Sequence, residues 1–179
     1  MSTHLKLIGL TGRKRCGKGT VAAMLPNYRC LSFAAPIKRM LMAVGVTPAE
    51  IEDKETILPR FGASPRFMMQ TLGTEWGRDI VSPQLWTGLA YREANPILKI
   101  GLGVVFDDLR FDNEAQLVKD MGGVIWCIER PNLASDSHVS ERGIDPKFID
   151  HRLANFGTVA MLRETVTSLL SSQERALLS

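Results

Sequence analysis

The chain has 179 residues, of which 45% are hydrophobic and 23% charged, and this composition is typical of a single globular domain. It excludes a disordered or fibrous protein. Basic residues exceed acidic ones by only three, with 22 Lys and Arg against 19 Asp and Glu, so the overall charge gives no argument for nucleic-acid binding.

The cysteines and the apolar residues indicate a reducing, cytosolic compartment. Cys16, Cys30 and Cys127 are odd in number and lack CxxC spacing, which disfavours a disulfide framework and a zinc site. No stretch approaches the roughly 18 consecutive apolar residues of a membrane-spanning helix. The first residues lack the basic segment and apolar run of a signal peptide. We therefore expect a cytosolic protein.

The first third of the chain predicts a strand, a glycine-rich loop, a helix and a second strand. Residues 5–10 are almost continuously apolar, which favours a buried parallel strand. After the glycine-rich loop, residues 20–25 predict a helix that Pro26 ends. Residues 30–33 predict the second strand, and Pro36 suits the first turn of the helix that follows it.

The middle of the chain, from about residue 47 to residue 95, is predicted to be helical. One stripe at helical spacing carries polar residues and glycines, namely Arg66, Gln70, Gly73 and Gly77. A second, apolar stripe carries Met68, Leu72 and Trp76. Two interpretations of the glycines stay open: they let a ligand approach the helix closely, or they permit close contact between helices.

The second half alternates strands and helices. Residues 104–106 predict a central strand that ends at Asp107 and Asp108, and residues 112–121 predict a helix that a glycine pair stops. Residues 124–128 predict another buried strand, and Thr158 opens a last helix. This alternation predicts an α/β domain with a parallel sheet, where ligands bind at the carboxyl ends of the strands.

The clearest functional signal is the segment from Gly12 to Thr20, GRKRCGKGT. Two glycines five residues apart, followed by a lysine, let a loop surround a phosphate with backbone N–H groups while Lys18 reaches the β- and γ-phosphates. Gly19 stands where Ser or Thr usually meets magnesium, and the hydroxyl comes one residue later at Thr20. The segment therefore predicts a nucleoside triphosphate site. Three further loop cations either strengthen this site or are solvated surface charges: Arg13, Lys14 and Arg15.

A second signal is the sequence Asp107-Asp108-Leu109-Arg110 at the end of the predicted central strand. A carboxylate at the tip of a strand beside a phosphate loop can hold magnesium, directly or through water. Neighbouring residues of a strand point to opposite sides, so the sequence leaves open which aspartate faces the site. The alternative is a pair of solvated acids.

Five segments of the chain, taken together, resemble the bacteriophage deoxynucleoside monophosphate kinases: residues 12–20, 32–38, 70–78, 108–115 and 155–158. The resemblance implies a three-layer P-loop kinase fold of the α/β class with a central parallel sheet, formed by residues 1–179 as one domain. It also implies a helical acceptor-binding region at about residues 47–95 and a short lid at about residues 130–152.

The resemblance further implies roles for individual residues. Those for ATP binding are Gly12, Arg15, Cys16, Gly17, Lys18, Gly19, Thr20 and Arg130. Those for the acceptor are Lys14, Lys38, Arg66, Gln70, Gly73, Trp76, Trp86 and Arg142. The catalytic set is Lys18, Asp108, Arg110 and Arg130, and the Mg²⁺ ligands are Asp108 and Thr20, directly or through water. For Trp76, a core position on the apolar stripe is the alternative.

The predicted reaction transfers the γ-phosphoryl group of ATP to a deoxynucleoside monophosphate (dNMP), with Mg²⁺, in the cytoplasm, or the host cytoplasm for a viral protein. One alternative is a P-loop kinase for another small phosphorylated acceptor such as dephospho-coenzyme A. Another is a nucleotide-binding switch, against which stands the lack of a water-positioning Gln after the strand-end acids. No partner nucleic acid or membrane is expected. The accepted bases and a homodimeric state stay open.

Overall fold

The computed structural model describes residues 6–131 and 143–176. These residues form two compact units: the chain up to Ser32 together with the chain from Tyr91 onward, and Phe33–Ala90. We call them the sheet unit and the helical unit. The region predicted to be helical, 47–95, falls mostly in the helical unit, which begins earlier, at Phe33. Of the predicted lid, residues 132–142 lie outside the described residues.

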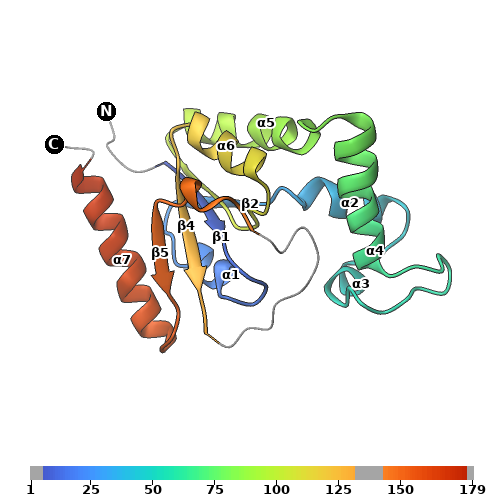
Figure 1. Cartoon of the computed structure of the whole chain (residues 1–179), viewed down its shortest axis with the longest axis horizontal. Helices are drawn as coiled ribbons and strands as arrows, with labels where there is room; N and C mark the ends of the chain where they lie inside the picture. The colour runs from blue at the N-terminus through green and yellow to red at the C-terminus, as the bar shows by residue number, and fades with distance from the viewer. Residues whose placement is uncertain (1–5, 132–142, 177–179) are drawn as a thin grey trace. The chain divides into compact units, whose positions relative to one another are not determined.

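A five-stranded parallel sheet forms the centre of the sheet unit (Figure 1). Its strands lie in the order β2 (Tyr28–Leu31), β3 (Gly103–Phe106), β1 (Leu7–Thr11), β4 (Val124–Glu129) and β5 (His151–Ala154). Every neighbouring pair is parallel. The α/β class with a central parallel sheet is therefore confirmed, and the carboxyl ends of all five strands lie at one edge.

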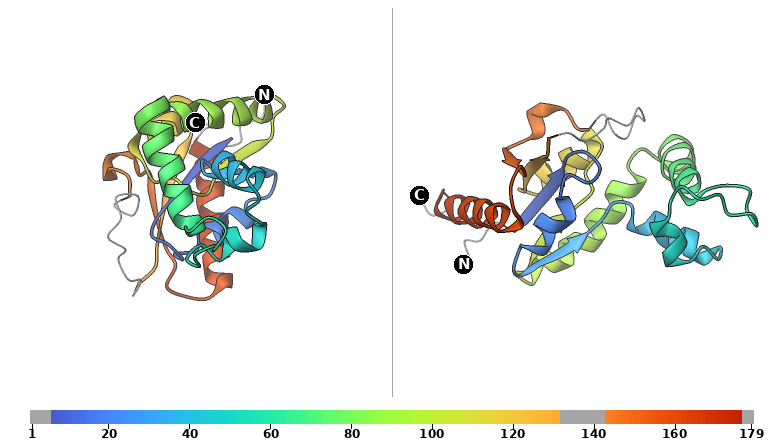
Figure 2. Two further views of the ribbon diagram at one scale, coloured as in Figure 1. Left: turned by 90° about the vertical axis from the view of Figure 1, so that its right-hand side faces the viewer. Right: turned by 90° about the horizontal axis from the view of Figure 1, so that it is seen from below.

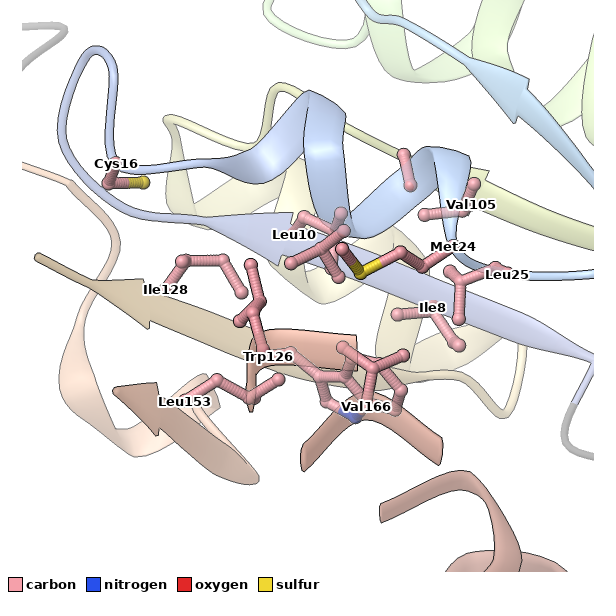
Figure 3. Packing of buried hydrophobic residues seen from close by; sticks show 13 residues of the cluster. Ile8, Leu10, Cys16, Met24, Leu25, Val105, Trp126, Ile128, Leu153 and Val166 are labelled. Carbon is pink, nitrogen blue, oxygen red and sulfur yellow. The ribbon is translucent and has the colours of Figure 1, made fainter. Parts of the chain in front are cut away.

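Helices cover both faces of this sheet. On one face, Ile8 and Leu10 of β1 pack with residues of α1 (Lys18–Ala23) and α7 (Val159–Ala176), and Trp126 lies in the same core (Figure 3). On the other face, α6 (Asp112–Asp120) contacts β1 and β4. There a Cβ on Gly9 would lie 2.7 Å from a methyl group of Leu109. Burial on both faces explains why β1 is continuously apolar in sequence.

The boundaries of the first elements differ from those predicted. The second strand, expected at residues 30–33, is β2 at Tyr28–Leu31. It lies at the edge of the sheet, and its residues Arg29 and Cys30 are exposed, so its start carries no apolar signal. The first helix, expected from residue 20, begins at Lys18. Among the described residues, no helix is long and apolar enough to cross a bilayer.

The helical unit is built from short helices around its own core. These are α2 (Ala35–Ala43), α3 (Pro48–Glu52), α4 (Pro65–Gln70), the π-helix η1 (Thr71–Val81) and the first part of α5 (Leu85–Lys99). Pro36 lies in the first turn of α2, as predicted. The core contains Ile37, Leu41 and Trp86 together with Val46, Ile51 and Leu58. α4 runs into η1 without a break (Figure 1, Figure 2).

The two glycines of η1 permit close packing within the helical unit. A Cβ on Gly77 would lie 2.4 Å from the ring of Trp86, and one on Gly73 would lie 3.0 Å from Ile37 Cδ1. Trp86 is 2% exposed, and its Nε1 donates a 2.7 Å hydrogen bond to the Gly73 carbonyl. Of the two interpretations of the glycine stripe, the structure supports close contact between helices.

We expect Gly77→Ala to lower the free energy of unfolding by about 1–3 kcal/mol, because the added methyl overpacks a buried ring. Gly88→Ala in α5 is the matched control, since nothing lies within 4 Å of its Cβ position. That change should raise stability by about 0.5–1 kcal/mol through helix propensity alone. Urea unfolding of both variants measures the two changes in the free energy of unfolding. If Gly77→Ala were stabilised as much as Gly88→Ala, the close packing of Gly77 against Trp86 would be contradicted.

Candidate active site at the phosphate loop

The loop between β1 and α1 adopts backbone conformations that require its glycines. Gly12 has φ +132°, and a Cβ there would lie 2.4 Å from the carbonyl oxygen of Ile128. Gly17 has φ +110°, and its Cβ would lie 2.6 Å from Asn155 Nδ2. The positive φ disfavours a side chain at both positions, and at Gly12 the backbone of Ile128 also leaves no space for one. The predicted order of strand, glycine loop and helix is present.

The Lys18 ammonium group lies against the backbone of its own loop. Nζ donates hydrogen bonds of 2.7 Å to the Gly12 carbonyl and 3.0 Å to the Arg13 carbonyl. It also lies 3.8 Å from Cys16 Sγ. These two carbonyl oxygens hold the cation within the loop.

A cavity of about 460 Å³ opens at this loop, entirely within the sheet unit. Its wall contains six residues predicted for ATP: Arg15, Gly17, Lys18, Gly19, Thr20 and Arg130. It also contains Asp107, one of the two strand-end acids between which the sequence did not decide. Four further residues of the wall were not predicted for the site: Asn155, Gly157, Val159 and Leu162. Asn155 directly follows β5, so the rule that ligands bind at strand carboxyl ends, which had pointed to the acids after β3, could have identified it as well.

Cys16 is the predicted ATP residue whose side chain faces away from this cavity. Its side chain is 1% exposed and belongs to the hydrophobic core beneath the loop (Figure 3). Its backbone carbonyl accepts a 2.8 Å hydrogen bond from Asn155 Nδ2. A role of Cys16 in binding ATP would therefore fall to its backbone.

The structure distinguishes the two strand-end acids. Asp107 lines the cavity, whose wall also contains Lys18 and Thr20. Asp108, the residue predicted to be catalytic and to bind metal, accepts a 2.6 Å hydrogen bond from Ser32 Oγ and is absent from the cavity wall. The catalytic and metal-binding roles of Asp108 stay a prediction. Adjacent residues at the end of β3 point apart, and Asp107 is the one on the cavity side.

The thiol of Cys30 reports on the environment of Asp107. Partial burial of the thiol, the charge of Asp107 and a hydrogen bond to Asp107 raise the pKa of Cys30 to about 11, with burial contributing most. The charge of Asp108 raises this pKa as well, by a smaller amount. Because only the thiolate reacts with alkylating agents, Cys30 should react slowly at pH 8 although it is exposed.

We expect Asp107→Asn to accelerate alkylation of Cys30 by iodoacetamide at pH 8 severalfold, because loss of the negative charge lowers the thiol pKa and increases the thiolate fraction. Mass spectrometry of the Cys30 peptide gives the rate. Cys127 is the internal control, since the charges that act on its pKa are those of Glu129, Arg152, Cys16 and Lys18. An unchanged Cys30 rate would contradict the placement of Asp107.

Arg110 lies at a second hollow of about 260 Å³. This hollow is also lined by Thr11, Gly12 and Arg13, so it shares the start of the phosphate loop with the first cavity. The Arg110 backbone N–H donates a 2.9 Å hydrogen bond to the carboxylate of Glu114, which is 2% exposed. The predicted catalytic arginine is thus anchored beside the loop but does not line the first cavity.

The residues predicted for the acceptor are divided between the units. Lys14 is exposed on the phosphate loop, while Lys38 and Gln70 lie partly buried in the helical unit. Arg66 forms an ion pair with Glu55, with an Nη2–Oε1 distance of 2.6 Å. Arg142 lies outside the described residues.

Trp76 and Trp86, both predicted for the acceptor, differ in their exposure. Trp86 lies in the core at 2% exposure, so it offers no open ring face for a base, whereas Trp76 is 39% exposed. Their ring centroids are 6.4 Å apart. The apolar stripe had suggested a core position for Trp76. The π-helical hydrogen bonding of η1 changes the residues per turn, so stripes drawn at α-helical spacing do not hold there.

Comparison with known proteins shows the family. A family model described as deoxynucleotide monophosphate kinase matches residues 62–166. A putative deoxynucleotide monophosphate kinase of Acanthamoeba polyphaga mimivirus is 37% identical over 158 residues, which cover 75% of this chain and 80% of that protein. The deoxynucleoside-5'-monophosphate kinase of Escherichia phage T5 is 34% identical over 114 residues, covering 58% of this chain and 44% of that protein.

A solved structure supports the fold. Dephospho-CoA kinase from Campylobacter jejuni superimposes with a TM-score of 0.56 over 95% of this chain and 98% of that chain, at 12% sequence identity. At this identity the likeness concerns the fold alone, and it agrees with the predicted P-loop kinase architecture. The match of the family model and the mimivirus relative identify the protein at the level of family: the chain belongs to the deoxynucleotide monophosphate kinases.

Proposed function

We propose that this chain transfers the γ-phosphoryl group of ATP to the 5′-phosphate of a deoxynucleoside monophosphate, giving ADP and a deoxynucleoside diphosphate. The observation that carries the proposal is the cavity at the phosphate loop, where Lys18, Thr20 and Asp107 meet in one wall. Membership of the deoxynucleotide monophosphate kinase family supports the choice of acceptor.

ATP binds with its phosphates along the loop of residues 12–17. Lys18 leaves the Gly12 and Arg13 carbonyls, 2.7 Å and 3.0 Å from its Nζ, and pairs with phosphate oxygens, which are stronger acceptors because they are charged. Arg15 and Arg130 add positive charge to the same wall. Phosphoryl transfer depends mainly on positioning and on such charge stabilisation.

The residues of the cavity fit Mg²⁺. Asp107 and Thr20 offer a carboxylate and a hydroxyl in one wall, and Mg²⁺ prefers such oxygen donors. Among the described residues no three His, Cys, Asp or Glu side chains form a metal-binding group. In phosphoryl-transfer sites Mg²⁺ is commonly held by one or two protein groups together with substrate phosphates. When bound, the ion neutralises charge on the phosphate oxygens.

The helical unit supplies groups for the acceptor. Lys38, Arg66 and Gln70 provide two cations and an amide for an anionic nucleotide, and the exposed ring of Trp76 provides an apolar surface. Arg66 is paired with Glu55, so the acceptor phosphate competes with this carboxylate for the guanidinium. The acceptor phosphate is already anionic at neutral pH, and the reaction therefore needs no general base.

Release of ADP from ATP, measured with each of the four deoxynucleoside monophosphates, tests the proposal. Ribonucleoside monophosphates and dephospho-coenzyme A serve as comparison acceptors. We expect turnover that depends on a deoxynucleotide and exceeds the turnover with either comparison. Acceptor-independent ADP release would instead indicate a nucleotide-hydrolysing switch, and turnover with dephospho-coenzyme A alone would overturn the proposed acceptor.

A further inference from the structure

Asn155 connects the carboxyl end of β5 to the phosphate loop. Its backbone N–H donates a 2.7 Å hydrogen bond to the Glu129 carbonyl, which continues the pairing of β4 with β5 beyond Glu129 and Ala154. Its side-chain Nδ2 donates a 2.8 Å hydrogen bond to the Cys16 carbonyl, 139 residues away in sequence. The backbone bond fixes the place from which the short side chain reaches the loop.

The same side chain fills the space that Gly17 leaves open. A Cβ at Gly17 would lie 2.6 Å from Asn155 Nδ2, so the amide stands where a side chain of residue 17 would be. The Cys16 carbonyl and the Gly17 N–H belong to one planar peptide group. A hydrogen bond that holds this carbonyl therefore also sets the direction of the Gly17 N–H, one of the loop's phosphate-binding donors.

The Cys16–Gly17 peptide is held from both of its ends. On one side the Cys16 side chain is buried in the core, and its N–H donates to the Arg13 carbonyl at 3.2 Å. On the other side Gly17 leads directly into α1, with its carbonyl accepting a 2.9 Å hydrogen bond from the Val21 N–H. Between these two anchors, the amide of Asn155 is the group that contacts the Cys16 carbonyl from a different part of the chain.

We propose that Asn155 is a positioning residue for phosphate binding: its side-chain amide holds the Cys16–Gly17 peptide in the orientation that accepts the phosphates of ATP. The inference rests on the proposed function, because it takes ATP as the ligand of the loop. Asn155 also lines the cavity together with Gly157 and Val159. Its side chain therefore connects the segment after β5, which forms part of the cavity wall, to the phosphate loop after β1.

Steady-state kinetics of Asn155→Ala and Asn155→Asp test the proposal. Loss of the amide donor should raise the KM for ATP about tenfold in Asn155→Ala at pH 8, as expected for one lost hydrogen bond to a binding loop. The increase should be larger in Asn155→Asp, because its carboxylate also repels the phosphates. The KM for the deoxynucleotide should stay within about twofold of the wild-type value, because the contact of Asn155 is to the ATP loop. Titration of ATP alone should show the same weakening.

Asn27→Gly is the matched control. Asn27 is an exposed asparagine of the sheet unit with φ +64°, a conformation that glycine adopts without strain. Its KM for ATP should equal that of the wild type. Equal increases in both KM values of Asn155→Ala, or an unchanged ATP KM in both Asn155 variants, would overturn the proposal.

Asn155→Asp adds a pH signature that a purely structural role would not show. A carboxylate cannot donate to the Cys16 carbonyl, whereas a protonated carboxyl can. Nearby phosphate charge raises the pKa of such a carboxyl above its usual 3.9 or so. Its ATP KM should therefore approach the wild-type value as the pH falls from 8 to about 5.5, whereas the Asn155→Ala defect persists. Relief of charge repulsion alone would bring Asn155→Asp only to the KM of Asn155→Ala, so a recovery that stops there would contradict the hydrogen-bond role.

These outcomes separate the inference from the proposed function. If wild-type protein binds ATP but shows no deoxynucleotide-dependent turnover, the proposed acceptor fails, and ATP titration of the variants still decides the role of Asn155. If the wild-type protein is active and the Asn155 variants bind ATP as tightly as the wild type, only the proposed role of Asn155 fails.

Discussion

Lys18→Ala is expected to lower kcat/KM for ATP by about 10²–10³-fold, the loss seen when one preorganised charge-stabilising group is removed from an active site. The Nζ atom lies within the phosphate loop, 2.7 Å and 3.0 Å from two of its carbonyl oxygens. Alanine removes the cation that neutralises charge on the β- and γ-phosphates, and this charge increases as the phosphoryl group moves. The dominant effect should be on kcat.

The same substitution removes two hydrogen bonds that hold the loop, so folding must be measured separately. The thermal midpoint of Lys18→Ala should change little, because the loop is also held by Asn155 and by the buried Cys16. Lys99→Ala, which removes an exposed lysine at the end of α5, is the control for loss of one positive charge. Full activity of Lys18→Ala in a correctly folded protein would refute the phosphate-loop assignment.

Asp107→Asn is expected to reduce kcat about 100-fold and to raise the Mg²⁺ concentration needed for half-maximal rate. Asp107 lines the cavity with Lys18 and Thr20, and an amide is a much weaker Mg²⁺ ligand than a carboxylate. The change preserves the shape of the side chain, so packing should be unaffected.

Asp108→Asn is the matched comparison, since it makes the same change at the adjacent residue. An asparagine oxygen can still accept the 2.6 Å hydrogen bond from Ser32, and we expect less than about a tenfold loss in kcat. Rates measured over a range of Mg²⁺ concentrations distinguish the two variants. If Asp108→Asn instead lowered kcat more, and raised the required Mg²⁺ concentration more, than Asp107→Asn, then Asp108 would be the metal-binding aspartate, as predicted from the sequence.

The contrast between these aspartates shows where sequence reasoning stops. The pair could be placed at the carboxyl end of a buried strand from the apolar run that precedes it. Which of the two faces the cavity depends on where β3 ends and on what its neighbours offer. Ser32, which follows β2, donates a hydrogen bond to the Asp108 carboxylate. That partner is 76 residues away and leaves no local signal.

The helical unit shows the same limit. Its helices were predictable from proline positions and apolar spacing, yet the faces of residues 71–81 were not, because η1 is a π-helix. The core position that the apolar stripe offered as the alternative for Trp76 is therefore not the one observed, since this residue is 39% exposed. Gly73 and Gly77 pack closely against Ile37 and Trp86. The ion pair of Arg66 with Glu55 joins residues from separate segments, which a search for cationic residues does not detect.

The sequence by itself determined the phosphate loop, the parallel sheet and the family resemblance. A phosphate loop is built from contiguous residues whose spacing and backbone freedom are written in order along the chain, and buried strands carry their own apolar signal. Only the tertiary structure decided that Asp107 enters the cavity and that Asn155 holds the Cys16 carbonyl. These contacts depend on strand order and register, which bring distant segments together, and no spacing within one segment encodes them.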